Sequence, residues 1–167
     1  MEEQIMKLFT ASDILNFAIR IEEDGELFYH RAANFADTDE IRSLFNQLAD
    51  EEIHHKRIFT EMLEKINDVR PPETYPGEFM DYLRDYIDGN VVFSTDIKTV
   101  ADDIHDTTSA LKFAMGRELT SIAYYHEVKS FVPEKHYPQV DAIIQEERKH
   151  FTKLSEVLKS YQQKNTK

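Results

Sequence analysis

Two short motifs in this sequence combine a carboxylate with an imidazole at helical spacing. Glu52 precedes His55 by three residues, and Glu147 precedes His150 by three residues. Residues three apart share one face of an α-helix, so the two side chains of each pair can bind one metal ion together. A single Glu-x-x-His is a weak signal, because many solvated helices contain one by chance. The chain also has no cysteine, so a metal site in it must use carboxylate and imidazole ligands.

Two more acids fall inside apolar helix faces. At about 100° per residue, Glu22 and Glu118 lie within the stripes that would face a core, as Glu52 and Glu147 do in their own helices. Burying a carboxylate without a counter-charge is strongly unfavourable. The stripes contain no Lys or Arg by this pattern. We therefore expect two divalent cations to neutralise four buried carboxylates.

These acids and histidines also recur in an internal repeat. Shifting the first helical segment by 96 positions, or the second by 95, superimposes like residues. The matched polar pairs are Glu22 with Glu118, Tyr29 with Tyr125, Glu51 with Glu146, Glu52 with Glu147, and His55 with His150. Core packing alone would not require acids and histidines to recur.

Helical periodicity predicts the elements that must position these residues. The predicted helices cover 12–35, 39–67, 107–131 and 138–161, the first opened by a capping box. Two short links and one long connection, 68–106, predict an all-α fold: a ferritin-like four-helix bundle with one long crossover between helices 2 and 3. The tail after Tyr161 is expected to fray.

The domain prediction is one domain over 1–167, built from the two repeated hairpins 12–67 and 107–161. The 167 residues include only 4 Gly and 5 Pro, which favours long helices. Within the crossover, apolar residues are expected to cover the bundle, with a homodimer contact as the alternative. These residues are Phe79, Leu83, Ile87, Val91, Val92 and Phe93.

Charge and hydropathy exclude several classes of function. The formal net charge of −12 argues against nucleic acid and against an anionic membrane surface as partners. No stretch approaches the roughly 20 apolar residues of a membrane span, and the first residues do not read as a targeting peptide. We therefore expect a cytoplasmic protein.

The chain resembles the rubrerythrin-like group of the ferritin-like superfamily. The stretches that carry the resemblance are AIRIEEDGELFY, LADEEIHHKRIF, ALKFAMGRELTSIAYY and IIQEERKHFTKL. A Glu from each of two helices and Glu-x-x-His from each of the other two is the di-iron carboxylate pattern. The resemblance thus implies a rubrerythrin-type di-iron domain with six metal ligands. They are Glu22, Glu52, His55, Glu118, Glu147 and His150.

Two departures from that family and one comparison with bacterioferritins shape the functional expectation. There is no cysteine-rich rubredoxin domain, so electrons must come from an external donor. Ser121 stands where rubrerythrins carry an extra Glu, which puts peroxidase activity in question. Ile53 stands where bacterioferritins carry the Met that binds haem, so no haem is expected.

The leading hypothesis is a non-haem di-iron oxidoreductase that reduces hydrogen peroxide or dioxygen, with no catalytic residues beyond the metal ligands. Ferroxidase activity in iron handling is one alternative, and a non-catalytic, metal-stabilised binding bundle is another. The cofactor prediction is two iron ions, with Mn, Zn or a mixed pair also compatible with these ligands. Tyr29 and Tyr125 either hydrogen-bond to the ligands or are ordinary core tyrosines. The other histidines, His30, His54, His105, His126 and His136, are expected to be structural or exposed.

Overall fold

Four long helices make up the described part of the chain. The computed structural model describes residues 10–66 and 104–165, and these contain no strand. The helices are α1 (Ala11–Ala32), α2 (Asp39–Lys65), α5 (Thr107–Val128) and α6 (Tyr137–Asn165), with the short 3-10 turns η1 (Ala33–Phe35) and η3 (Glu134–His136). The prediction of an all-α four-helix bundle is confirmed. The apolar residues for which a covering role was predicted in the crossover lie outside the described residues.

Polar caps fix where three of the helices begin. At the start of α1, the Thr10 backbone N–H donates to Asp13 Oδ2 (2.9 Å) and the Asp13 N–H donates to Thr10 Oγ1 (3.2 Å). Asp106 and Ser109 form the same reciprocal pair at the start of α5, and Thr38 caps α2. These bonds satisfy amide groups that have no partner inside the helix. The capping box predicted for the first helix is confirmed.

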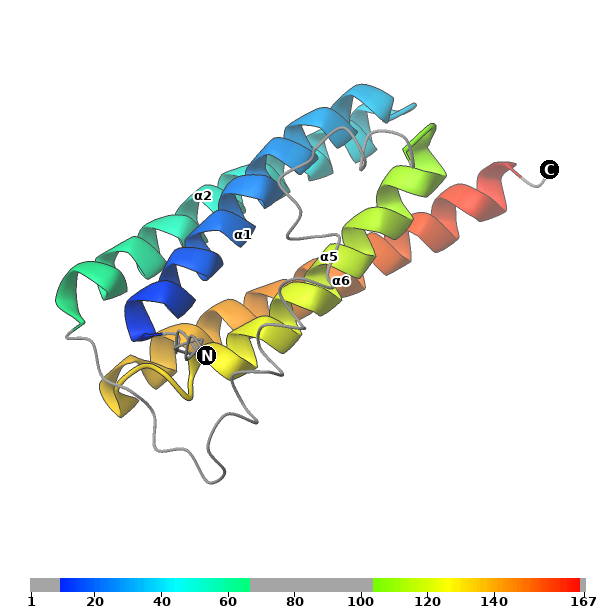
Figure 1. Cartoon of the computed structure of the whole chain (residues 1–167). Helices are drawn as coiled ribbons and strands as arrows, with labels where there is room; N and C mark the ends of the chain where they lie inside the picture. Colours follow the sequence, from blue (N-terminus) through cyan, green and yellow to red (C-terminus); the bar gives the residue numbers. More distant parts are fainter. Residues whose placement is uncertain (1–9, 67–103, 166–167) are drawn as a thin grey trace, which may run out of the picture.

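The helices pair as two hairpins that lie side by side (Figure 1). α1 packs mainly on α2, and α5 packs mainly on α6. Two apolar clusters fill the bundle: one contains Ile14 and Phe59, and the other contains Phe45 and Leu111. In every helix the candidate metal ligands come between residues of the first cluster and residues of the second. A polar layer is therefore held between two apolar blocks that restrict its side chains.

Two helix ends differ from the sequence prediction. α5 ends at Val128 rather than near 131, because the chain turns there and buries Phe131 and Val132 at the end of the bundle. α6 continues to Asn165, so the prediction of fraying after Tyr161 was wrong for 162–165. The Tyr161 hydroxyl donates to Asp37, which ties the last turns of α6 to the link before α2. No described helix is long and apolar enough to cross a membrane.

Candidate metal centre

The six predicted ligands come together in the polar layer, one or two from each helix. We refer to Glu22, Glu52, His55, Glu118, Glu147 and His150 as the ligand cluster. Their ligating atoms form two groups, each with atoms within 4.8 Å of one another. The first group is Glu22, Glu52, His55 and Glu147, and the second is Glu118, Glu147 and His150. Glu147 belongs to both groups, so its two carboxylate oxygens could serve both candidate metal positions.

All six residues of the ligand cluster are buried. Glu22 and His55 have no exposed surface, and the other four are at most 5% exposed. A buried carboxylate is tolerated only where charge or hydrogen bonds compensate it. The burial therefore requires a counter-charge at this level of the bundle.

The two imidazole rings are oriented the same way. His55 Nδ1 lies 3.0 Å from Glu147 Oε1 and 3.7 Å from Glu22 Oε2. His150 Nδ1 lies 2.9 Å from Glu147 Oε2 and 3.8 Å from Glu118 Oε2. Each ring thus points Nδ1 into the ligand cluster, where it can bind a metal.

The opposite ring nitrogens contact carboxylates of the opposing hairpin. His55 Nε2 lies 2.7 Å from Glu146 Oε2, and His150 Nε2 is hydrogen-bonded to Glu51. A carboxylate that accepts the Nε2 proton leaves Nδ1 free to bind a cation and fixes the plane of the ring. Glu51 and Glu146 are partly exposed, with side chains 36% and 44% accessible, and no role in the site was predicted for them from the sequence. Their recurrence in the sequence repeat was the signal that could have identified them.

Three buried atoms of the first group lack a hydrogen-bond partner. They are Glu22 Oε2, His55 Nδ1 and Glu147 Oε1. His55 Nδ1 and Glu147 Oε1 are close enough to attract each other, yet they are not aligned as donor and acceptor. Unpaired buried polar atoms are rare and call for a specific explanation. A divalent cation between these three atoms satisfies all of them at once, so the residues present fit a metal.

The pKa values of the ligand cluster show how protons take the place of cations. Burial and then the negative charge of Glu147 raise the pKa of Glu118 to about 8. Burial, followed by repulsion from Glu22 and Glu147, raises the pKa of Glu52 well above its usual range. Burial disfavours the charged form of His55, but its interactions with Glu147 and Glu22 outweigh this and raise its pKa to about 12.

Glu147 behaves in the opposite way to the other acids. Burial favours its neutral form, but its interactions with His150 and His55 outweigh burial and hold its pKa well below the usual range. The same carboxylate helps to raise the pKa of His150 to about 10. Two protonated imidazoles therefore flank an ionised Glu147 when no cation is bound, and a metal must displace those protons.

Two buried tyrosines connect the hairpins through the ligand cluster. The Tyr29 hydroxyl donates to Glu118, and the Tyr125 hydroxyl donates to Glu22. Each tyrosine thus supports the ligand on the helix that corresponds to its own in the sequence repeat. Of the two interpretations offered by the sequence, the contact with the ligands is correct.

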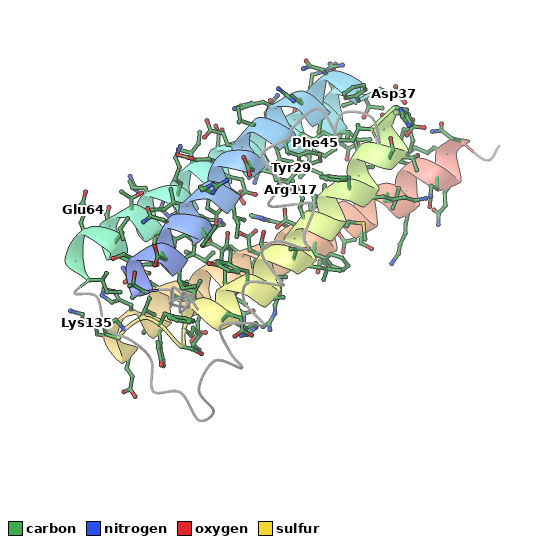
Figure 2. The ribbon with its side chains drawn as sticks, in the orientation of Figure 1. Tyr29, Asp37, Phe45, Glu64, Arg117 and Lys135 are labelled. Carbon is green, nitrogen blue, oxygen red and sulfur yellow. The ribbon has the colours of Figure 1, made fainter. Side chains whose placement is uncertain are left out.

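Arg117 corrects the sequence prediction that no Lys or Arg enters the apolar faces. Its side chain is only 4% exposed, and Nη2 donates to the Ile21 carbonyl oxygen at 3.0 Å. Gly25 makes this possible, because a Cβ there would lie 2.7 Å from Arg117 Nη2 and 2.8 Å from Glu52 Cδ. Figure 2 shows Arg117 directed into the space between the hairpins, near Tyr29. Arg117 forms no direct ion pair with an acid of the described residues, so it does not replace the cations.

A groove of about 750 Å³ reaches the ligand cluster from outside. It runs between α2 and α6, where Glu51, Glu146 and His150 line it together with Lys149 and Lys153. His150 is therefore the ligand closest to solvent, whereas Glu22 and His55 are sealed inside.

The remaining histidines take no part in the ligand cluster. His30, His54, His105 and His126 are exposed, as expected for surface residues. His136 is buried near the start of α6, with Nδ1 2.9 Å from Gln139 Oε1. Ile53, the residue at the position relevant to haem, is exposed on α2.

The fold and the site together define a four-helix bundle with a carboxylate and imidazole cluster able to hold two metal ions. The rubrerythrin family model matches residues 13–158, and the chain belongs to the rubrerythrin family. The predicted resemblance is therefore confirmed. The chain is similar to a crystal structure from Thermotoga maritima described as a candidate ferritin-like diiron-carboxylate protein. The two share 28% sequence identity over 91% of this chain and 96% of that one, with a TM-score of 0.66. A search of the curated proteins gave no match.

Proposed function

We propose that this protein is a di-iron carboxylate oxidoreductase that reduces hydrogen peroxide or dioxygen with electrons from an external donor. The observation that carries the proposal is the pair of buried ligand groups joined by Glu147. Membership of the rubrerythrin family and the similarity to a chain described as a diiron-carboxylate protein favour iron. Carboxylate and imidazole ligands also accept Mn or Zn, so metal identity is part of the test.

The ligand cluster would hold one cation beside His55 and one beside His150. Glu22 and Glu52 would contribute to the first position, Glu118 would contribute to the second, and Glu147 could contribute to both. When bound, a pair of ferrous ions supplies two electrons at one place together with Lewis acidity. The described helices hold their side chains between two apolar blocks, so the ligand positions are set before metal arrives.

Reduction of hydrogen peroxide to two water molecules consumes two electrons and two protons, and the surrounding residues can manage those protons. Burial and the neighbouring Glu118 charge raise the pKa of Tyr29 well above its usual range, so its hydroxyl keeps its proton and stabilises the carboxylate. Glu51 and Glu146 contact the ligand imidazoles and remain 36% and 44% exposed. These outer carboxylates can exchange protons with water and so connect the rings to solvent.

The groove between α2 and α6 favours the proposal that the substrate is a small oxidant. It brings solvent to the outer side of His150, while the two apolar clusters close the bundle above and below the polar layer. Peroxide and dioxygen are small enough to pass beside the outer carboxylates. Electrons would arrive from a separate donor protein, because the chain has no cysteine for an iron–sulfur centre of its own.

The deciding experiment begins with elemental analysis of protein purified without added metal. Two iron ions per chain are expected, and their reduced form should consume hydrogen peroxide or dioxygen in the presence of an added reductant. Glu147→Ala should lose both the iron and the activity. Lys159→Ala, which changes an exposed residue on the same helix, is the matched control and should keep both.

The other outcomes distinguish the alternatives. Oxidation of many Fe(II) ions per chain, with slow turnover of peroxide, would replace the oxidoreductase proposal with ferroxidase activity. Metal binding without oxidation of Fe(II) or consumption of peroxide would indicate a metal-stabilised binding bundle. Unchanged metal content in Glu147→Ala would show that the ligand assignment is wrong.

A further inference from the structure

Arg117 is a marked departure of the site from its own internal symmetry. The repeat pairs each ligand with a residue of the same type, and it pairs Tyr29 with Tyr125. The same shift pairs Arg117 with Ile21, and Ser121 with Gly25. A permanent positive charge therefore stands on one side of an otherwise symmetric set of acids and histidines.

The guanidinium is held in place by contacts that leave it close to Glu52. Its carbon lies 5.6 Å from the centre of the Phe28 ring, and its Nη2 donates to the Ile21 carbonyl oxygen. Because Gly25 has no side chain, the Ile21 carbonyl oxygen is accessible to Arg117, and the side chains of Arg117 and Glu52 both pack against α1 at Gly25. Arg117 Nε is buried and has no hydrogen-bond partner. The charge is thus fixed beside Glu52 without being cancelled by a direct ion pair.

The ligands are distributed unevenly between the two groups. By the repeat, Glu52 corresponds to Glu147, which belongs to both ligand groups. Glu52 belongs only to the first group and leaves the second with three residues.

We propose that Arg117 is a positioning residue that makes the two metal positions unequal, by holding Glu52 in the first group so that this carboxylate does not serve the second. This inference rests on the proposed two-metal centre. A fixed cation attracts a nearby buried carboxylate strongly, because the low polarity of the interior leaves their attraction poorly screened. With Glu52 held in the first group, the second position has one carboxylate fewer. The position beside His55 fills first and tightly, and the position beside His150, next to the groove, fills second and exchanges more readily.

The test is a titration of metal-free protein with Co(II), followed by its visible absorption and by calorimetry. The wild-type chain should bind two Co(II) ions in two separate steps. Arg117→Gln keeps a donor for the Ile21 carbonyl and removes the charge, so its second step should tighten on the order of tenfold or more. Arg117→Lys keeps the charge and should retain two separate steps. Circular dichroism of the metal-free variants verifies that each is folded.

A purely structural role for Arg117 predicts the opposite change in the affinity for the second Co(II) ion. In that case Arg117→Gln would loosen the site and weaken both steps, and this result would overturn the inference. Equal affinities for the two ions in the wild-type chain would also overturn it, while the two-metal centre would stand. Wild-type protein that binds fewer than two ions of both Co(II) and Fe(II) would instead refute the proposed function.

Discussion

Replacement of Gly25 by Ala tests whether close packing at α1 shapes the ligand cluster. The added Cβ would lie 2.7 Å from Arg117 Nη2, 2.8 Å from Glu52 Cδ and 3.0 Å from Glu52 Oε2. Real Cβ atoms essentially never approach other atoms this closely, so at least one of the two buried side chains must move. Glu52 belongs to the first ligand group, so in the proposed metal centre its displacement should lower metal occupancy.

Two effects on stability oppose each other in Gly25→Ala. Replacing glycine by alanine inside a helix stabilises by about 1 kcal/mol. Overpacking a filled interior costs about 1–3 kcal/mol. The net result should range from no change to a loss of about 2 kcal/mol, with the larger loss expected because both neighbours are buried.

Gly116→Ala is the matched control. Gly116 is an exposed residue of α5, and a Cβ there would meet no atom within 4 Å. This variant should gain the full helical benefit of about 1 kcal/mol and keep its metal. For a chain of this size 1 kcal/mol corresponds to about 2–4 °C in Tm.

The assay is thermal unfolding of both metal-free variants, together with iron content after reconstitution. Gly116→Ala should melt above the wild-type chain, and Gly25→Ala should melt below Gly116→Ala and bind less iron. If Gly25→Ala were as stabilising as Gly116→Ala and carried a full complement of iron, the packing argument would be refuted.

Three further predictions concern charge in the ligand cluster. Glu146→Gln should weaken metal binding by about 10–100-fold, because the His55 ring loses the carboxylate that orients it; the exposed Glu156→Gln should leave a competitive metal titration unchanged. Glu52→Gln should raise the Tm of metal-free protein, because it removes repulsion between buried carboxylates. Glu147→Gln should lower the Tm, because His55 and His150 stabilise the Glu147 carboxylate. Equal Tm shifts in the two variants would contradict the opposite pKa directions of Glu52 and Glu147. The folded-state pKa of His55, raised to about 12 from 6.5, contributes stability that is complete below pH 6.5 and is lost as the pH rises toward 12. The Tm of metal-free protein should therefore fall between pH 6.5 and 9.5, and a flat profile would show that His55 is neutral in the fold.

The six ligands illustrate how far sequence reasoning reaches for this protein. Glu22 and Glu118 were identified because they interrupt apolar stripes, and the Glu-x-x-His pairs because residues three apart share a helix face. Those rules are local, so they hold before the tertiary structure is known. The roles of Glu51 and Glu146 depend on contacts between hairpins, and no rule within one helix could predict them.

Arg117 is a residue whose environment could not be predicted from the sequence. The helical pattern placed no Lys or Arg in the apolar stripes, and only the absence of a side chain at Gly25 on another helix creates room for Arg117. The same reasoning applies to Tyr161, whose contact with Asp37 extends α6 beyond the predicted end. Both outcomes depend on which surfaces meet, and residue spacing carries no information about that.

The sequence by itself determined the four helices, the repeated hairpin and the residues that can bind metal, because helical periodicity and capping act within a few positions of the chain. Only the tertiary structure decided that Glu147 is shared between two ligand groups, that Glu52 is not, and that Arg117 lies beside it. These features arise from distances between side chains of different helices, and such distances are set when the two hairpins pack together.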